Sequence, residues 1–353
     1  MLYLDANATE VPRPEAMAAA AAAMALGGNA SSVHGQGRAA RRVLEDAREA
    51  LAARFGASPA QLVLTAGGTE ANALALHGFS ENRRILAGAT EHAAVRAFAH
   101  SVIPVLGDGR LDLDALEALL RAGPALVAVM AANNETGVLH PIEAVAALCA
   151  AHRAHLHVDG VQAAGRVALA PGWHSLAISG HKLGGPMGAG ALLLAPGLHP
   201  RAIMAGGGQE RGRRGGTEPL PAIAGMAAAA QAGSATHLAA LRDAIEAGLP
   251  PGVMVAGQAA ARLGNTTQLV LPGIAAERQV MVLDGMGICV SAGAACSSGK
   301  VTQSHVLAAM GFAENAGCGI RVSLPWNAGA DAAERFLTGY RAMAKRLGRR
   351  MGA

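Results

Sequence analysis

The sequence predicts an α/β fold with a large and a small domain. Its 353 residues are enough for about two domains. Short apolar runs alternate with longer, Ala-rich helical stretches, and strands joined through helices form a mainly parallel sheet with helices on both faces. The run Leu249-Pro250-Pro251-Gly252 ends this alternation, and shorter elements follow it. We therefore expect a large domain over residues 15–249 and a small α+β domain built from residues 1–14 and 250–353.

The individual elements follow from apolar runs for strands and from helical periodicity or alanine content for helices. In the large domain the expected strands are residues 61–65, 84–87, 125–130, 155–158, 176–179 and 190–194. The expected helices there are residues 14–26, 36–55, 70–78, 113–122, 142–152 and 219–248. In the small domain the expected elements are residues 268–271, 277–284, 302–310, 319–323 and 330–347.

Composition excludes several classes of protein. Hydrophobic residues make up 52% of the chain, but the longest apolar run, residues 16–26, is mostly alanine and too short to span a bilayer. The net charge is only +4 and aromatics are 3%, which disfavours a nucleic-acid partner. Residues 1–5 do not resemble a signal peptide, and four cysteines without a CxxC pair predict neither a disulfide scaffold nor a metal site. A cytoplasmic protein is expected.

Lysine is scarce, with three residues among 29 Lys and Arg: Lys182, Lys300 and Lys345. A lysine amine can lose its proton and form a Schiff base, which arginine cannot do. Lys182 follows an apolar strand in Ser179-Gly180-His181-Lys182, at the sheet edge where α/β proteins bind ligands. An exposed loop lysine is the alternative interpretation. The scarcity of lysine and the neighbouring Gly, Ser and His favour a Schiff-base lysine.

Two further strand ends carry candidate binding residues. Gly68 and Thr69 lie where a strand turns into a helix, which fits either an anion cradle or an ordinary capped turn. Asp159 ends a buried strand, where a carboxylate can pair with the protonated pyridine nitrogen of a pyridoxal ring. His155 and His157 on the same strand are interpreted as packing or surface residues, because a zinc site needs three or four converging ligands.

Four other features indicate a reaction site or a loop. His92, just beyond a strand, is a candidate to stack on a ring or to transfer protons. Cys296 lies among small residues, which suits a thiol that must be reached and must move. Arg321 in an apolar strand fits either a substrate carboxylate or a structural salt bridge. The stretch 205–217 is rich in Gly and Arg and fits a solvated loop or a phosphate nest.

Taken in order along the chain, these motifs resemble the NifS/IscS-type cysteine desulfurases, which are pyridoxal 5'-phosphate (PLP) enzymes of the class V aminotransferase group. The resemblance covers nearly the whole chain. It is carried by residues 3–9, 28–34, 65–72, 90–92, 133–137, 159–162, 179–182 and 206–217, the Cys296 loop and the Arg321 strand. It implies PLP fold type I, with a large domain built on a mixed, mainly parallel sheet flanked by helices.

The resemblance also implies a role for each residue. Lys182 would bind PLP covalently, Asp159 would pair with the pyridine nitrogen, Gln162 would contact the phenolic oxygen, and His92 would stack on the ring. The phosphate would be held by Gly68, Thr69, Ser179, His181, and Thr217 from the neighbouring subunit of a homodimer. Asn134 and Arg321 would bind the carboxylate of L-cysteine. Cys296 would take the sulfur as a persulfide and pass it to an acceptor such as an iron–sulfur scaffold.

The chain departs from the usual pattern of this family at three places: Met187 after Gly185-Pro186, Gly216 before Thr217, and Pro325-Trp326 after Leu324. Two alternatives accompany the desulfurase hypothesis. The first is another enzyme on the same scaffold, a selenocysteine lyase or a class V aminotransferase. The second is a catalytically weak partner protein in iron–sulfur assembly.

Overall fold

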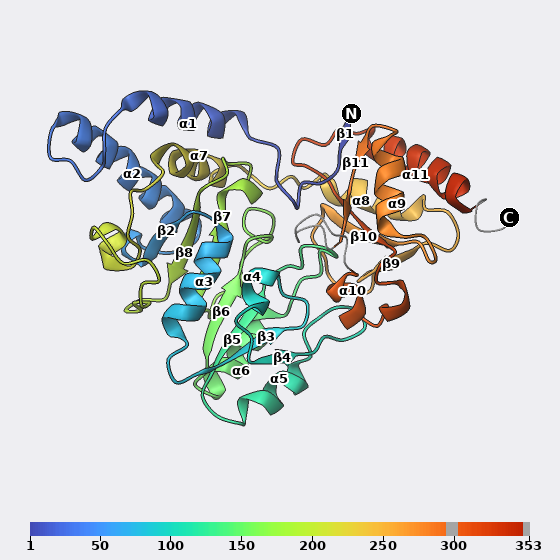
Figure 1. Ribbon diagram of the computed structural model, residues 1–353, viewed down its shortest axis with the longest axis horizontal. Helices are drawn as coiled ribbons and strands as arrows, with labels where there is room; N and C mark the ends of the chain where they lie inside the picture. The colour runs from blue at the N-terminus through green and yellow to red at the C-terminus, as the bar shows by residue number, and fades with distance from the viewer. Residues whose placement is uncertain (294–302, 349–353) are drawn as a thin grey trace.

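The computed structural model describes residues 1–293 and 303–348, which form an α/β arrangement around a large central sheet (Figure 1). Seven strands form this sheet in the order β2-β8-β7-β6-β5-β3-β4. Their bounds are β2 Leu62–Thr65, β3 Arg84–Gly88, β4 Ser101–Ile103, β5 Ala125–Met130, β6 His155–Asp159, β7 Ser175–Ser179 and β8 Gly190–Leu194. β8 is antiparallel to β2 and β7, and the other pairs are parallel, so the predicted mixed, mainly parallel sheet is confirmed.

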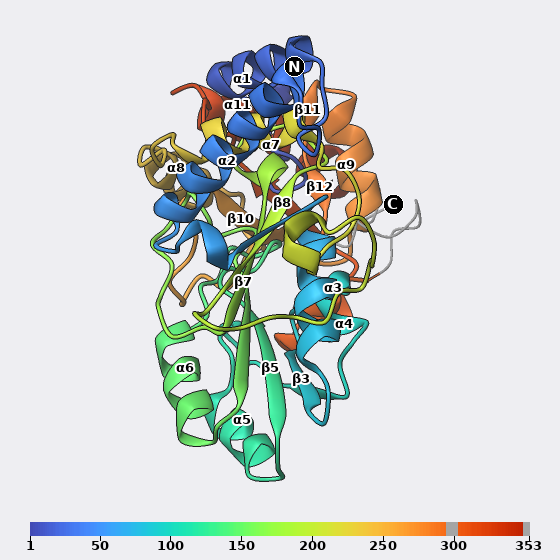
Figure 2. The ribbon, with the colours of Figure 1, turned by 90° about the vertical axis from the view of Figure 1, so that its left-hand side faces the viewer.

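Helices cover both faces of this sheet, because its strands are apolar on both sides (Figure 2). The core on one face receives side chains from α1 Pro14–Leu26, α2 Gly35–Arg54, α5 Leu113–Leu120, α6 Ile142–Ala151 and α7 Leu220–Ala230. The other face is covered by α3 Gly68–Phe79 and α4 Ala93–Arg96. The strands expected in the large domain are all present. β4 and α4 were not expected, because such short elements leave too little pattern to detect.

A second core lies around two smaller sheets. One has the order β12-β13-β10-β9 and the other pairs β1 with β11. The strands are β1 Leu2–Tyr3, β9 Met254–Ala256, β10 Thr266–Val270, β11 Ile288–Cys289, β12 Ser291–Ala292 and β13 Gly319–Ser323. The helices are α8 Leu238–Ala247, α9 Ala276–Asp284, α10 His305–Ala309 and α11 Ala332–Gly348. Leu2 and Leu4 bring the N-terminal segment into this second core, where β1 runs parallel to β11.

The single helix expected over residues 219–248 is wrong, because the structure has two helices there, α7 and α8. The residues between them include Gly233, Ser234 and Thr236, which favour non-helical backbone. The buried residues of α7 belong to the core of the large sheet, whereas Leu238 and Ile245 of α8 belong to the second core. One straight helix cannot serve both cores. The division into domains at residue 249 remains a prediction.

Across residues 1–293 and 303–348, no helix is both long enough and apolar enough to cross a membrane. In the same ranges, no group of three or more His, Cys, Asp or Glu is arranged to hold a metal ion. The parallel strands β5, β6 and β7 end at the same edge of the large sheet. The candidate residues that follow these strands are therefore brought together there.

Candidate active site

A cavity of about 260 Å³ lies at this edge, between the large sheet and β13 of the second core. Its walls contain every predicted site residue of the described ranges except Thr217. These residues are Gly68, Thr69, His92, Asn134, Asp159, Gln162, Ser179, His181, Lys182 and Arg321. Asn7 and Ala8 of the N-terminal segment complete one side of it. The fold thus gathers residues from distant parts of the sequence into one site.

Lys182 ends the short 3-10 helix Gly180–Lys182 that follows β7. Its Nζ donates hydrogen bonds to the carbonyl oxygen of Asn7 at 2.5 Å and to that of Ala8 at 2.7 Å. These carbonyls hold the amine at the wall of the cavity, where it can reach a ligand that carries an aldehyde. Sequence reasoning did not predict that the N-terminal segment would supply these acceptors, since nothing local in it points to the lysine.

Asp159 ends β6 and its carboxylate is buried in the cavity wall. The Oδ1 atom accepts a hydrogen bond from the backbone of Val161 at 2.9 Å, and Oδ2 accepts one from Asn72 Nδ2 at 2.7 Å. Burial raises the pKa of Asp159, while these hydrogen bonds and the nearby His92 and Lys182 lower it. A cationic ligand group facing this carboxylate would further stabilise its ionised form.

A hydrogen-bonded chain continues behind Asp159. Asn72 Oδ1 lies 2.8 Å from His157 Nε2, and His157 Nδ1 lies 2.9 Å from Ser175 Oγ. Burial lowers the pKa of His157 to about 3, so the ring is neutral. Of the two interpretations of His157, a packing or a surface residue, the structure agrees with packing: the ring is fully buried and contacts Asn72, which in turn donates to Asp159. The positions of His157 and Asp159, two apart on one strand face, were the available signal.

His92 caps α4, and its Nδ1 accepts a hydrogen bond from the backbone of Ala94 at 3.2 Å. In the neutral ring the proton therefore lies on Nε2. The half-buried ring lines the same cavity as Lys182 and Asp159. From this position the His92 ring can stack on a bound ligand or exchange a proton with it.

Arg321 reaches the cavity from β13 and is buried. Its Nη2 forms an ion pair with Asp5 Oδ1 at 2.7 Å, and its Nη1 donates to the carbonyl of Asn134 at 3.1 Å. The Nε atom is buried and has no hydrogen-bond partner among the residues that the structure describes. The structural salt bridge considered for this arginine is thus present, and the guanidinium keeps one donor for a ligand carboxylate.

The candidate phosphate-binding residues surround the N-terminus of α3, where Gly68 and Thr69 begin the helix. A Cβ added at Gly68 would lie 2.6 Å from Val161 Cγ2, so the cradle requires glycine. His181 Nδ1 lies 3.1 Å from Thr9 Oγ1, and burial together with Lys182 lowers the pKa of His181 to about 4. A neutral His181 can donate one hydrogen bond to an anion without adding charge.

One predicted residue of the described ranges, Thr217, does not line this cavity. Thr217 is exposed, on the loop between the 3-10 helix Gln209–Gly212 and α7, and it does not line the cavity. That position leaves it available to a neighbouring subunit. Cys296 lies outside the described residues.

Residues next to the Cys296 segment form a contact that sequence reasoning missed. Glu135 is buried, and its Oε2 accepts a hydrogen bond from Ser304 Oγ at 2.6 Å. Burial raises the pKa of Glu135, whereas the Ser304 hydrogen bond and the charge of Arg321 lower it. Gly293 lies against the same carboxylate. Glu135 thus contacts the described residues on both sides of the segment.

The cavity fits PLP on its own chemistry. An amine, a buried carboxylate that favours a facing cation, and a glycine cradle at a helix N-terminus are the groups that an aldehyde, a protonated pyridine and a phosphate require. Fold and site together define a PLP-dependent enzyme of fold type I. The chain belongs to the aminotransferase class-V family, whose model matches residues 2–336.

Relatives with defined names are similar over nearly the whole chain. The "Cysteine desulfurase" of Cereibacter sphaeroides is 40% identical over 94% of this chain and 92% of its own length. The "IscS-like cysteine desulfurase" of Mycobacterium tuberculosis is 37% identical over 98% of both chains. Among solved structures, a NifS-like protein from Rickettsia africae has a TM-score of 0.90 and 32% identity over 98% of this chain and 99% of its own.

Proposed function

We propose that this chain is a cysteine desulfurase that converts L-cysteine to L-alanine and takes the sulfur on Cys296 as a persulfide. The observation that carries the proposal is the convergence of Lys182, Asp159 and Arg321 on one cavity. The similarity to cysteine desulfurases over more than nine-tenths of the chain supports this choice within the family.

The described residues suggest how PLP would be held. Lys182 would carry it covalently, Asp159 would pair with its pyridine nitrogen, and Gln162 would donate to its phenolic oxygen. The phosphate would lie against Gly68, Thr69, Ser179 and His181, joined by Thr217 of the partner subunit. When bound, PLP supplies an electron sink for bonds at the α-carbon of an amino acid.

The substrate contacts follow from the orientation of Arg321. Its guanidinium would bind the carboxylate of L-cysteine, with the side chain of Asn134 beside it. Arg321 is already fixed by Asp5 and by the Asn134 carbonyl, so little side-chain entropy remains to be lost on binding. Lys182 and His92 line the same cavity and would remove and return protons at the α- and β-carbons of the substrate.

The sulfur transfer step needs no oxidant or reductant other than the enzyme thiolate and the substrate. The thiolate of Cys296 attacks the substrate sulfur, forming an S–S bond while the substrate C–S bond breaks. The carbon takes the electron pair of that bond and a proton, which completes the methyl group of alanine. The sulfur remains on Cys296 as a persulfide, and an external thiol or acceptor protein removes it.

The test is a purified protein mixed with L-cysteine and a reductant, with alanine and sulfide both measured. We expect equal amounts of the two products. The Cys296→Ala variant should make neither at an appreciable rate, and Cys318→Ala, which removes a half-buried thiol elsewhere, should keep the wild-type rate. Full activity of Cys296→Ala would contradict the persulfide step. Transfer of the amino group to a keto acid, without release of sulfide, would instead identify an aminotransferase.

A second test addresses the lysine. Lys182→Ala should lose the visible absorption of lysine-bound PLP, while Lys345→Ala, at an exposed position on α11, should keep it. Loss of the absorption in both variants, or in neither, would contradict the assignment of Lys182.

The partners belong to the same proposal. A homodimer would bring Thr217 of the partner subunit to each site, and light scattering of the purified protein tests it. A sulfur acceptor such as an iron–sulfur scaffold would complete the cycle.

A cytoplasmic location is supported by Cys149, Cys289 and Cys318, which are all free thiols.

A further inference from the structure

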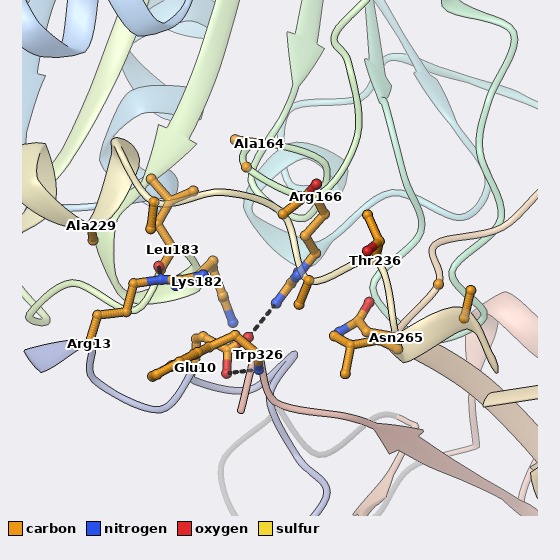
Figure 3. Close-up of a pocket in the computed structure, with 17 residues that line it drawn as sticks. Glu10, Arg13, Ala164, Arg166, Lys182, Leu183, Ala229, Thr236, Asn265 and Trp326 are labelled. Carbon is orange, nitrogen blue, oxygen red and sulfur yellow. Dashed lines mark hydrogen bonds and ion pairs between the residues drawn. The ribbon is translucent and has the colours of Figure 1, made fainter. Parts of the chain in front are cut away.

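A second cavity, of about 210 Å³, lies next to the first, and Lys182 lines both. Figure 3 shows Arg166 in this second cavity, with its guanidinium directed at Glu10. Arg166 Nη2 and Glu10 Oε2 are 3.5 Å apart, and the two side chains are 14% and 5% exposed. A buried pair of this kind is costly to desolvate, so its orientation must be supported by further contacts.

Those contacts come from two separate segments of the chain. Glu10 Oε1 accepts a hydrogen bond from the backbone of Val11 at 2.9 Å. It accepts a second from the backbone of Trp326 at 3.3 Å (Figure 3). The indole of Trp326 donates to the Val11 carbonyl at 2.9 Å. The N-terminal segment and the segment after β13 therefore hold Glu10, and Glu10 faces Arg166.

On its other side Arg166 holds Gln162. Arg166 Nη1 donates to the Gln162 carbonyl at 3.0 Å and to the side-chain Oε1 at 2.5 Å. A guanidinium has only donors, so the amide oxygen must face it and the amide nitrogen must face away. Gln162 Nε2 then donates one N–H to the Asn7 carbonyl at 3.0 Å, which leaves its second N–H for a ligand in the first cavity.

We propose that Arg166 is a positioning residue that selects one of the two amide orientations of Gln162, so that an N–H and not the carbonyl oxygen meets the phenolic oxygen of PLP. This inference rests on the proposed role of Gln162. Without Arg166, only the Asn7 carbonyl opposes a 180° turn of the amide, a turn that would place two oxygens against each other and remove the donor.

The orientation has a spectroscopic consequence. An N–H donated to the phenolic oxygen stabilises its negative charge and weakens its hold on the proton shared with the lysine-derived nitrogen. The pKa of that nitrogen is therefore lower with the donor than without it. A hydrogen bond of ordinary strength corresponds to about half a pH unit to one unit. The measurement is the pH midpoint at which the visible band of the holoenzyme changes.

The experiment is a double-mutant cycle on the holoenzyme with Arg166→Met and Gln162→Ala. We expect Arg166→Met to raise the midpoint by about 0.5–1 unit in the wild-type background and to leave it unchanged in the Gln162→Ala background. An equal shift in both backgrounds would mean that Arg166 acts directly through its charge, and this would overturn the inference. No shift in the wild-type background would overturn it as well.

Two further variants keep the test decisive. Arg166→Lys keeps a donor for the amide oxygen and should retain the wild-type midpoint. The Glu10→Gln/Arg166→Met variant removes both charges, which protects the fold if the single variant is unstable, and it should show the raised midpoint. Arg262→Met is the control, because Arg262 forms a similarly buried pair with Glu246 away from both cavities. A protein with no lysine-linked band would refute the PLP assignment, whereas an intact band with unmoved midpoints would refute only the role of Arg166.

Discussion

Asp159 and His157, two residues apart on β6, are joined through the side-chain amide of Asn72. Asn72 donates to Asp159 Oδ2 at 2.7 Å and its Oδ1 lies 2.8 Å from His157 Nε2. Because the pKa of His157 is lowered to about 3 by burial, its ring is neutral, and the N–H on Nε2 fixes which way the Asn72 amide points. A neutral histidine thus ensures that Asp159 receives an N–H, which favours the ionised form of the carboxylate against the effect of burial.

Asn72→Ala should weaken both stability and cofactor binding. It leaves Asp159 and His157 each short of a buried hydrogen bond, for a loss of about 3 kcal/mol in the free energy of unfolding. The pKa of Asp159 should rise further, and PLP should bind more weakly. Urea unfolding and a PLP titration measure the two effects. Asn29→Ala removes an exposed hydrogen bond to Ser31 and should cost less than about 1 kcal/mol.

The stability of the PLP-free protein should depend on pH through His157. In the unfolded chain the His157 ring takes up a proton as the pH falls through about 6.5, whereas in the folded protein the pKa of His157 is about 3. The stabilisation is complete above pH 6.5 and is lost as the pH falls toward 3. His157→Asn should therefore flatten the pH dependence by about 1.4 kcal/mol per pH unit between pH 6 and 4. An unchanged slope would contradict this, and the exposed His199→Asn provides the reference.

Arg321→Lys should impair substrate binding more than cofactor binding. The lysine keeps the charge but loses the planar fork that matches a carboxylate. We expect KM for L-cysteine to rise about 10–100-fold, with a smaller change in kcat and an unchanged visible band. If the variant instead loses the band without a rise in KM, the role of Arg321 is structural and limited to its salt bridge with Asp5. The exposed Arg335→Lys should behave as wild type.

Gly293→Ala should affect sulfur transfer through Glu135. A Cβ at position 293 would overlap Glu135 Oε2, which is already held by Ser304, so one of these groups must shift. We expect about 1–3 kcal/mol of destabilisation and slower sulfide release, with PLP binding retained. Gly285→Ala is the matched control, because the nearest atom to its Cβ would be 3.5 Å away. Equal effects of the two substitutions would contradict a specific role for the contact between Gly293 and Glu135.

The sequence was informative wherever a local pattern is sufficient. Apolar runs located β2, β3, β5, β6, β7 and β8, and strand ends followed by Gly or polar residues located Lys182, Asp159 and Gly68. Local pattern was insufficient at residues 219–248, where continuous alanine and leucine predicted one helix. Its two halves pack against different cores, and periodicity cannot reveal which core a helix face meets.

By itself the sequence determined the parallel-sheet scaffold, the scarce lysine and the acid after a buried strand, because each depends on residue type and short-range spacing. Only the tertiary structure decided the partners: Asn7 and Ala8 for Lys182, Asp5 for Arg321, and Glu10 for Arg166. These contacts join the N-terminal segment to residues more than 150 positions away. Hydrogen bonds and ion pairs act over a few ångströms, and only folding brings such distant residues within that range.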